Sequence, residues 1–237
     1  MMDLLPMVLI PGLLTDRTAW KEQIRHFQPR YELILPQDHW DQPTIAAMAE
    51  HILEGLPPQF ALVGWSMGGY ISFEIMRRAP HRVSRLALIS TSARQDPPQY
   101  AVERRASVRT AREFGPAVAW RQKMGLSFYR PERLSKETIT ELERVTERLG
   151  ADLYESQQEA IIGRADSRDL LQGITCPTIV ICGTHDSSTP PPISWEIASA
   201  VSGAELHLLA ECGHCSPIED PETVNALLGA WMERSHE

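Results

Sequence analysis

The segment G-W-S-M-G at residues 64–68 has the residue types and the spacing of a nucleophilic serine on a tight turn. It continues the apolar run Phe60–Gly64 and leads directly into a helical pattern that begins at Met67. On such a strand-to-helix turn the serine backbone is strained and its hydroxyl is exposed, while the flanking glycines leave room for the neighbouring strand and helix. The N–H groups at the helix start can stabilise an oxyanion. The segment therefore predicts attack by Ser66 on a carbonyl carbon.

A base and an acid for this serine follow later in the chain. A serine hydroxyl becomes an effective nucleophile when a histidine accepts its proton, and a carboxylate must orient that histidine. Asp186 lies just after the apolar run Thr178–Gly183, and His214 lies just after the run Glu205–Leu209. The order nucleophile, acid, base is the one that a G-x-S-x-G turn requires. An aspartate in such a loop can also simply cap the next helix, but its place after a strand favours a catalytic triad of Ser66, Asp186 and His214.

The elements that must position these residues alternate along the chain. The expected strands are Met7–Ile10, Tyr31–Leu35, Phe60–Gly64, Leu86–Ser90, Thr178–Gly183 and Glu205–Leu209. The expected helices between them include Thr44–Gly55, Met67–Ala79, Pro191–Val201 and Pro221–Met232. This alternation predicts an α/β fold with a mostly parallel central sheet flanked by helices. Several strands are continuously apolar, as buried parallel strands are.

Residues 94–172 break the alternation, because this stretch contains no convincing strand. Glycine and proline divide it into four or five helical patterns. These are Tyr100–Phe114, Ala117–Phe128, Lys136–Leu149, Ala151–Ile162 and a short one at Ser167–Leu171. We therefore expect a helical insertion at residues 94–172 between two strands of a core formed by residues 1–93 and 173–237.

Composition limits the classes of function. The chain has 237 residues, 43% of them hydrophobic, which is enough for one packed core, and its net charge of −8 argues against nucleic acid or an anionic membrane as a partner. The start, residues 1–6, has no basic segment followed by a long apolar run, so we expect no secretory signal, no membrane span and a cytoplasmic location. Four cysteines do not form a disulfide scaffold at this length.

Neither a metal nor a cofactor is expected. The chain has no phosphate-binding glycine loop and no dinucleotide fingerprint. Cys176 and Cys182 are six residues apart on or beside one strand, which does not suit the short chelating turn of a structural zinc site.

The sequence C-G-H-C at residues 212–215 allows a second interpretation, since a Cys-x-x-Cys pair is typical of thiol–disulfide oxidoreductases. In that class the motif lies early in its domain, and several strands follow it. Here only 22 residues follow Cys215, enough for one helix. We therefore expect His214 to be the functional residue and both cysteines to serve packing, with oxidation of a thiol beside the histidine as an open question.

With these motifs the chain resembles the α/β-hydrolase superfamily over nearly its whole length. The marks of the resemblance are G-W-S-M-G-G at residues 64–69, G-T-H-D at 183–186, G-H at 213–214 with E-D-P-E at 219–222, and I-P-G-L-L at 10–14 followed by Trp20. The chain is similar to small lid-bearing carboxylesterases, lactonases and pimeloyl-carrier methyl ester esterases. The resemblance implies that the backbone N–H groups of Leu13 and Met67 bind the oxyanion, and that the helical insertion follows the family's sixth strand and forms a lid (cap) over the pocket.

The chain also departs from the family pattern. Pro11-Gly12 replaces the usual His-Gly, which should leave catalysis intact because that histidine carries no proton. Residues 37–43 replace the usual glycine-rich loop after the second parallel strand, which leaves one wall of the pocket undefined. The N-terminal antiparallel hairpin is nearly absent, because the first parallel strand begins near Met7.

The substrate is the least defined part of the prediction. Residues expected to line an apolar pocket are Leu14, Trp65, Trp120, Met124 and Phe128, although large apolar side chains more often form core. Residues 94–133 carry nine basic and four acidic side chains, an excess of five positive charges. Such a surface would attract an anionic substrate or carrier, but a solvated helix surface explains the same pattern.

We therefore predict a serine carboxylesterase that cleaves a small carboxylic ester through an acyl-enzyme on Ser66. A lactonase, a thioesterase, a C–C bond hydrolase or a perhydrolase would use the same triad. A small-ligand receptor without catalysis is an alternative of another class. The expected partner is a small ester or acyl compound, and the chain is expected to be a monomer or a homodimer.

Overall fold

The computed structural model describes residues 5–234, in which six strands form one fully parallel sheet. The strands are β1 (Met7–Ile10), β2 (Leu33–Ile34), β3 (Phe60–Trp65), β4 (Val83–Ile89), β5 (Thr178–Gly183) and β6 (Glu205–Leu209), in the spatial order β2-β1-β3-β4-β5-β6. This confirms the predicted α/β fold. β1, β5 and β6 have the predicted bounds. β2 is shorter than predicted, because only Leu33 and Ile34 pair with β1 at the edge of the sheet.

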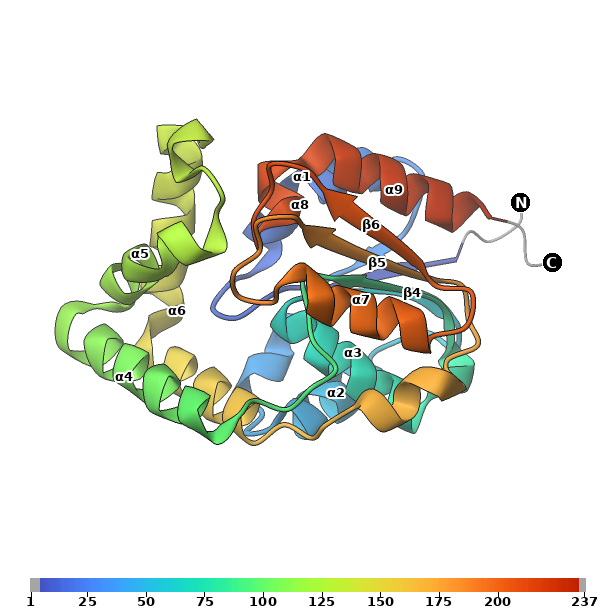
Figure 1. The fold of residues 1–237 in the computed structure, drawn as a ribbon, viewed down its shortest axis with the longest axis horizontal. Coiled ribbons are helices and arrows are strands. Elements are labelled where there is room, and N and C mark those ends of the chain that lie inside the picture. The colour runs from blue at the N-terminus through green and yellow to red at the C-terminus, as the bar shows by residue number, and fades with distance from the viewer. Residues whose placement is uncertain (1–4, 235–237) are drawn as a thin grey trace.

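The two faces of the sheet bury alternate residues of each strand, as the two-residue period of a strand requires. Val8 and Ile10 of β1 face the helices α2 (Ile45–Glu54), α3 (Met67–Arg78) and α7 (Pro191–Ala200) in one hydrophobic cluster. Met7 and Leu9 belong to a second cluster on the opposite face. That face is covered by α1 (Lys21–Phe27) and α9 (Pro221–Glu233), with the short α8 (Ser216–Glu219) before α9 (Figure 1).

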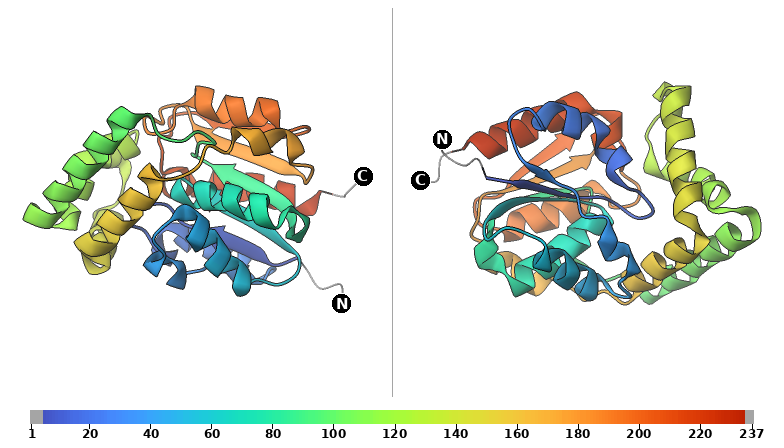
Figure 2. Two further views of the ribbon diagram at one scale, coloured as in Figure 1. Left: turned by 90° about the horizontal axis from the view of Figure 1, so that it is seen from below. Right: turned by 180° about the vertical axis from the view of Figure 1, so that it is seen from behind.

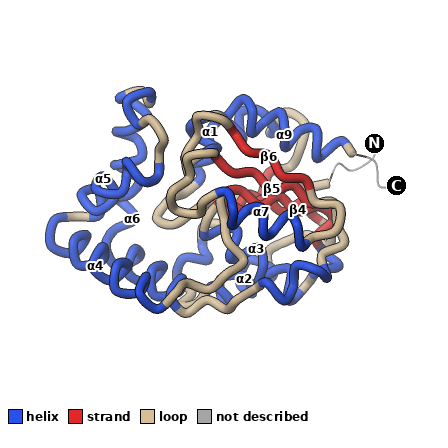
Figure 3. Tube along the Cα trace, in the orientation of Figure 1, coloured by secondary structure: helices blue, strands red, loops and turns tan. Residues whose placement is uncertain are grey.

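Residues 94–172 contain helices and no strand, so Figure 3 shows the strands confined to the rest of the chain. The helices of this insertion are α4 (Pro98–Phe114), α5 (Pro116–Ser127) and α6 (Lys136–Ile162), with short 3₁₀ turns at η4 (Pro131–Arg133) and η5 (Arg168–Gly173). The two helices predicted on either side of Gly150 join into α6, which kinks at that glycine (φ +84°, ψ 167°). In all views α4, α5 and α6 lie together on one side of the sheet (Figures 1 and 2).

Three further 3₁₀ segments belong to the core, namely η1 (Arg17–Trp20), η2 (Asp38–Asp41) and η3 (Pro80–Arg82). η2 occupies the position of the missing glycine-rich loop, and its His39 is fully buried. Burial holds the pKa of His39 down at about 4, so its imidazole is neutral near pH 7. Within residues 5–234 no helix has the length and apolar character needed to cross a membrane.

Candidate active site

Ser66 is the single residue between β3, which ends at Trp65, and α3, which begins at Met67. Its φ of +55° is a left-handed conformation that a serine rarely adopts. Two hydrogen bonds hold the backbone there: Ser66 N–H donates to the Ile89 carbonyl (2.9 Å), and the Thr91 hydroxyl donates to the Ser66 carbonyl (2.8 Å). The end of β4 therefore fixes the orientation of the serine.

Glycine at residues 64 and 68 is required by close packing around this turn. A Cβ atom on Gly64 would lie 2.3 Å from the Ser72 hydroxyl oxygen, and one on Gly68 would lie 2.1 Å from the Ile10 carbonyl oxygen. Both distances are far below van der Waals contact. The close approach at Gly68 brings the chain that follows β1 directly beside the serine turn.

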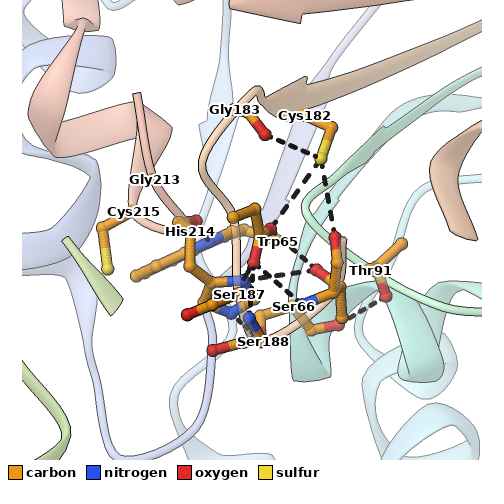
Figure 4. A network of polar contacts seen from close by, with 12 residues as sticks. Trp65, Ser66, Thr91, Cys182, Gly183, Ser187, Ser188, Gly213, His214 and Cys215 are labelled. Atoms are coloured by element: carbon orange, nitrogen blue, oxygen red, sulfur yellow. Dashed lines mark hydrogen bonds and ion pairs between the residues drawn. The ribbon is translucent and has the colours of Figure 1, made fainter. Parts of the chain in front are cut away.

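The structure brings Ser66, His214 and Asp186 together in one chain of hydrogen bonds. His214 Nε2 lies 2.9 Å from Ser66 Oγ, and His214 Nδ1 lies 2.9 and 3.0 Å from the two carboxylate oxygens of Asp186. The three residues follow β3, β5 and β6, and the carboxyl ends of parallel strands meet at one edge of the sheet. Figure 4 shows Ser66 and His214 side by side.

Asp186 is 3% exposed and is held by its own loop. Its carboxylate accepts hydrogen bonds from Ser188 N–H (2.9 Å), Thr189 N–H (2.8 Å) and the Thr189 hydroxyl (2.8 Å). Burial by itself would raise the pKa of this carboxyl. The favourable electrostatic interaction with His214 and the hydrogen bonds from His214 and Thr189 outweigh burial, so the pKa of Asp186 lies below its usual 3.8. Asp186 is therefore an anion that can orient the imidazole and stabilise its positive charge.

The backbone of His214 is held by residues outside its own loop. Its N–H donates to the Ser127 carbonyl at the end of α5 (2.8 Å), and its carbonyl accepts from Trp65 Nε1–H (3.0 Å). The Trp65 ring also lies against the imidazole, with 6.2 Å between the ring centroids. The residue before the nucleophile and the end of α5 thus fix the position of the base.

Glu219, five residues after His214, holds the same loop through its carboxylate. Its carboxylate accepts N–H hydrogen bonds from Gly213 and Cys215 on either side of His214 (3.1 Å each) and from Tyr129 of the helical insertion (2.8 Å). Burial raises its pKa, and these backbone hydrogen bonds offset part of that effect. Sequence reasoning included Glu219 in the family pattern but gave it no role. Its place five residues after His214 in that pattern was the available signal.

The loop after β1 lies against the nucleophile, as the predicted oxyanion site requires. A Cβ atom on Gly12 would be 3.4 Å from the Cβ of Ser66. Among the described residues, the N–H groups of Leu13 and Met67 have no protein hydrogen-bond acceptor. Both are therefore available to a ligand oxygen near Ser66.

The predicted pocket residues fall into two groups. Trp65, Trp120, Met124 and Phe128 belong to one hydrophobic cluster, in which the rings of Trp120 and Phe128 meet edge to face at 6.3 Å. Leu14 lies apart from them. It is 4% exposed and packs in a separate cluster with residues of α4, α5 and α6. Trp65 is also 4% exposed, so most of its surface contacts protein.

The excess of basic residues in the first half of the helical insertion is largely neutralised within the fold. Seven of the nine basic side chains form ion pairs, three of them with glutamates on α6. The pairs are Arg94–Glu196, Arg104–Asp96, Arg105–Glu159, Arg112–Glu155, Arg121–Glu143 and both Arg130 and Arg133 with Glu211. Paired charges attract a distant anion weakly. The structure therefore gives this surface mainly a role in joining α4 and α5 to α6 and to the core.

The two thiols beside His214 do not have the properties of a redox pair. Cys212 and Cys215 are free and buried, and burial, followed by the charge of Glu219, raises both thiol pKa values above their usual 9.0. A thiol–disulfide oxidoreductase needs the opposite, an accessible cysteine with a lowered pKa. Both cysteines therefore serve the packing of the core.

Comparison with known proteins agrees with this geometry. A family model described as the alpha/beta hydrolase family matches residues 7–227, so the chain belongs to the α/β-hydrolase family. A pimeloyl-[acyl-carrier protein] methyl ester esterase of Aromatoleum aromaticum is 27% identical over 203 residues, which are 78% of this chain and 79% of that protein. A 3-oxoadipate enol-lactonase 2 of Acinetobacter baylyi is 26% identical over 237 residues, 93% of this chain and 85% of that protein.

Among solved structures, a thermophilic esterase from Thermogutta terrifontis superimposes with a TM-score of 0.88 at 28% identity, covering 96% of this chain and 89% of that one. These similarities confirm the prediction of an α/β hydrolase that acts on ester bonds.

Proposed function

We propose that this protein is a carboxylesterase that hydrolyses small carboxylic esters through an acyl-enzyme on Ser66. The observation that carries the proposal is the unbroken path of hydrogen bonds from Asp186 through His214 to Ser66, with each heavy-atom distance between 2.9 and 3.0 Å. A nucleophile, a base and an orienting acid within hydrogen-bond reach of one another are the geometry that serine acyl transfer needs.

Each residue has one task in this mechanism. Ser66 Oγ attacks the ester carbonyl carbon while His214 Nε2 takes the hydroxyl proton, and Asp186 stabilises the resulting imidazolium. The N–H groups of Leu13 and Met67 donate to the carbonyl oxygen as it becomes negative. The C–O bond to the alcohol then breaks, and His214 returns the proton to the leaving oxygen. A water molecule attacks the acyl-enzyme with His214 again acting as base, which releases the acid and restores Ser66.

The helical insertion at residues 94–172 acts as the lid in this proposal, and the core consists of residues 1–93 and 173–237. The end of α5 supports the assignment, because the Ser127 carbonyl binds the His214 backbone and Phe128 packs with Trp65 in one cluster. Trp120, Met124 and Phe128 would then contribute the apolar wall that receives the acyl chain.

A lactonase activity is a second candidate, because one of the similar proteins is named an enol-lactonase. A lactone is an internal ester, so the same triad would open it. Because these arginines are paired, the basic residues give no reason to expect a preference for anionic substrates in either activity.

The test is a substrate panel with matched active-site variants. We expect the wild type to hydrolyse p-nitrophenyl acetate and butyrate and to react with a fluorophosphonate probe. Ser66→Ala should remove the labelling and lower kcat on the order of 10⁵- to 10⁶-fold. Ser202→Ala, an exposed serine far along the chain, should behave as wild type. Residual activity of Ser66→Ala above 1% of the wild type would refute the mechanism.

Two comparisons define the substrate class. A pair of p-nitrophenyl esters that differ only by a terminal carboxylate tests charge, and equal or better kcat/KM for the neutral ester is expected. A set of γ- and δ-lactones tests ring opening against linear esters of the same acyl length. Hydrolysis of lactones alone would replace carboxylesterase by lactonase as the function, on the same triad.

A further inference from the structure

The loop that carries the proposed oxyanion donor is bound by a side chain from α6, the last α-helix of the helical insertion. Gln157 on α6 accepts a hydrogen bond at Oε1 from the N–H of Leu14, at 2.8 Å. The two residues are 143 positions apart, and both are buried, with Gln157 0% exposed. Leu14 directly follows Leu13, so the orientation of its peptide group is linked to that of the oxyanion donor.

The Leu14 backbone needs such support, because its φ is +51°. A leucine avoids this left-handed conformation, since its Cβ crowds the backbone there. The loop itself contributes one short-range contact, from the Thr15 hydroxyl to the Gly12 carbonyl (2.8 Å). A contact from outside the loop is therefore needed to hold the Leu14 peptide against its own preference.

α6 also binds the same loop at a second position. Arg148 forms an ion pair with Asp16, whose carboxylate also caps the start of η1 by accepting from Thr18 N–H. Arg148 and Gln157 lie on opposite sides of the kink at Gly150. Both halves of α6 thus hold residues 14–16, so the position of the loop depends on the position of the insertion.

The hydrogen bond to Leu14 N–H is the one hydrogen bond that the Gln157 amide makes within the described residues. Its Nε2 is buried and has no hydrogen-bond partner among them. The neighbouring residue gives a natural comparison. Gln158 is equally buried, but its Oε1 accepts from Arg104 of α4, a contact within the insertion. The two adjacent glutamines are therefore equally buried but bind different partners, one in the loop after β1 and one within the insertion.

From this geometry we propose that Gln157 is a positioning residue for ester hydrolysis: it holds the Leu14 peptide so that the Leu13 N–H points at the oxyanion. The insertion is then part of the catalytic machinery as well as a cover for the pocket. This inference rests on the proposed function, in which Leu13 and Met67 bind the oxyanion.

Replacing the acceptor without emptying the site is the first test. Gln157→Met keeps the length and most of the volume of the side chain but cannot accept from Leu14 N–H. Because misplacement of a transition-state donor by about 1 Å lowers rates by about 100-fold, kcat should fall about 10- to 100-fold. KM should change less than about threefold, since the oxyanion forms only in the transition state. Gln158→Met is the matched control and should keep the wild-type kcat.

Gln157→Glu supplies a readout that a purely structural role would not move. A carboxyl at this buried site has a raised pKa, so at low pH it is neutral and keeps a carbonyl oxygen for Leu14 N–H. When it ionises, it still accepts from Leu14 N–H, but its negative charge lies against the loop that carries the Leu13 donor and opposes the developing oxyanion. The kcat of Gln157→Glu should therefore approach that of the wild type at low pH and fall as pH rises, relative to wild type and Gln158→Glu at each pH.

The outcomes separate this inference from the function on which it rests. If the wild type neither cleaves esters nor reacts with a fluorophosphonate, the proposed function fails. If the wild type is active and Gln157→Met keeps its kcat while only its melting temperature falls, Gln157 is merely structural and the inference is overturned. Should Gln157→Met not fold, the Gln157→Glu pH profile decides, and a profile parallel to that of the wild type overturns it.

Discussion

The contact between Gly68 and the end of β1 gives the sharpest quantitative prediction. In Gly68→Ala the new Cβ would lie 2.1 Å from the Ile10 carbonyl oxygen and 2.9 Å from the Pro11 carbonyl oxygen. To reach even 3.0 Å from the Ile10 oxygen, the two segments must separate by about 0.9 Å. Both opposing atoms belong to the backbone, so no flexible side chain can absorb the displacement.

This displacement acts on the oxyanion site, because Ile10 and Pro11 directly precede Gly12 and Leu13. A shift of about 1 Å between nucleophile and donor is expected to lower kcat about 100-fold. Overpacking of this kind also destabilises a core by about 1–3 kcal/mol. For a chain of this size that corresponds to a decrease in Tm of about 2–12 °C. Catalysis should therefore suffer far more than folding.

The assay compares Gly68→Ala with Gly173→Ala, a glycine where an added Cβ would meet nothing within 4 Å. Steady-state hydrolysis of p-nitrophenyl butyrate gives kcat and KM, and thermal melting gives Tm. Gly173→Ala should match the wild type in both. The reasoning is refuted if Gly68→Ala keeps its kcat within about threefold of the wild type, because the serine turn would then tolerate a separation that the structure makes incompatible with catalysis.

Two further predictions concern the histidine loop and the acid. Glu219→Gln replaces one acceptor oxygen by an NH₂ that faces backbone donors, so we expect stability to fall by about 1–3 kcal/mol and kcat to decrease. Glu222→Gln, at an exposed position at the start of α9, is the control and should not change either value. An unchanged Tm and kcat in Glu219→Gln would show that the three N–H contacts are dispensable. Because the pKa of folded Asp186 lies below its usual 3.8, its carboxylate stabilises the fold above that pH, and this contribution is lost as pH falls through the folded pKa. The stability difference between wild type and Asp186→Asn in urea unfolding should therefore shrink as pH falls into the acid range where the carboxylate is protonated. A difference that grows in acid would contradict the assignment.

Local sequence was sufficient where short-range geometry decides the structure. Continuous apolar runs bounded by glycine or proline predicted β1, β5 and β6 at their observed bounds, because buried parallel strands need apolar residues on both faces. The G-x-S-x-G turn predicted a strained backbone at Ser66, where φ is positive, because the glycine spacing reflects close packing of the backbone within a few residues. Chain order after these strands selected Asp186 and His214, which the structure brings together with Ser66.

Contacts between distant segments that no motif marks were beyond the reach of the sequence. A glutamine on an amphipathic helix looks the same whether it faces solvent or holds a loop 143 residues away, so the role of Gln157 appears only in the folded chain. The sequence left open whether the basic half of the insertion attracts anions or is a solvated helix surface, and its arginines pair with acidic residues on α6 and on the core. Types and spacing of residues determine local conformation and the identity of the reacting groups. Tertiary structure decides which buried polar groups meet, because each hydrogen bond needs two partners whose approach depends on the packing of the whole chain.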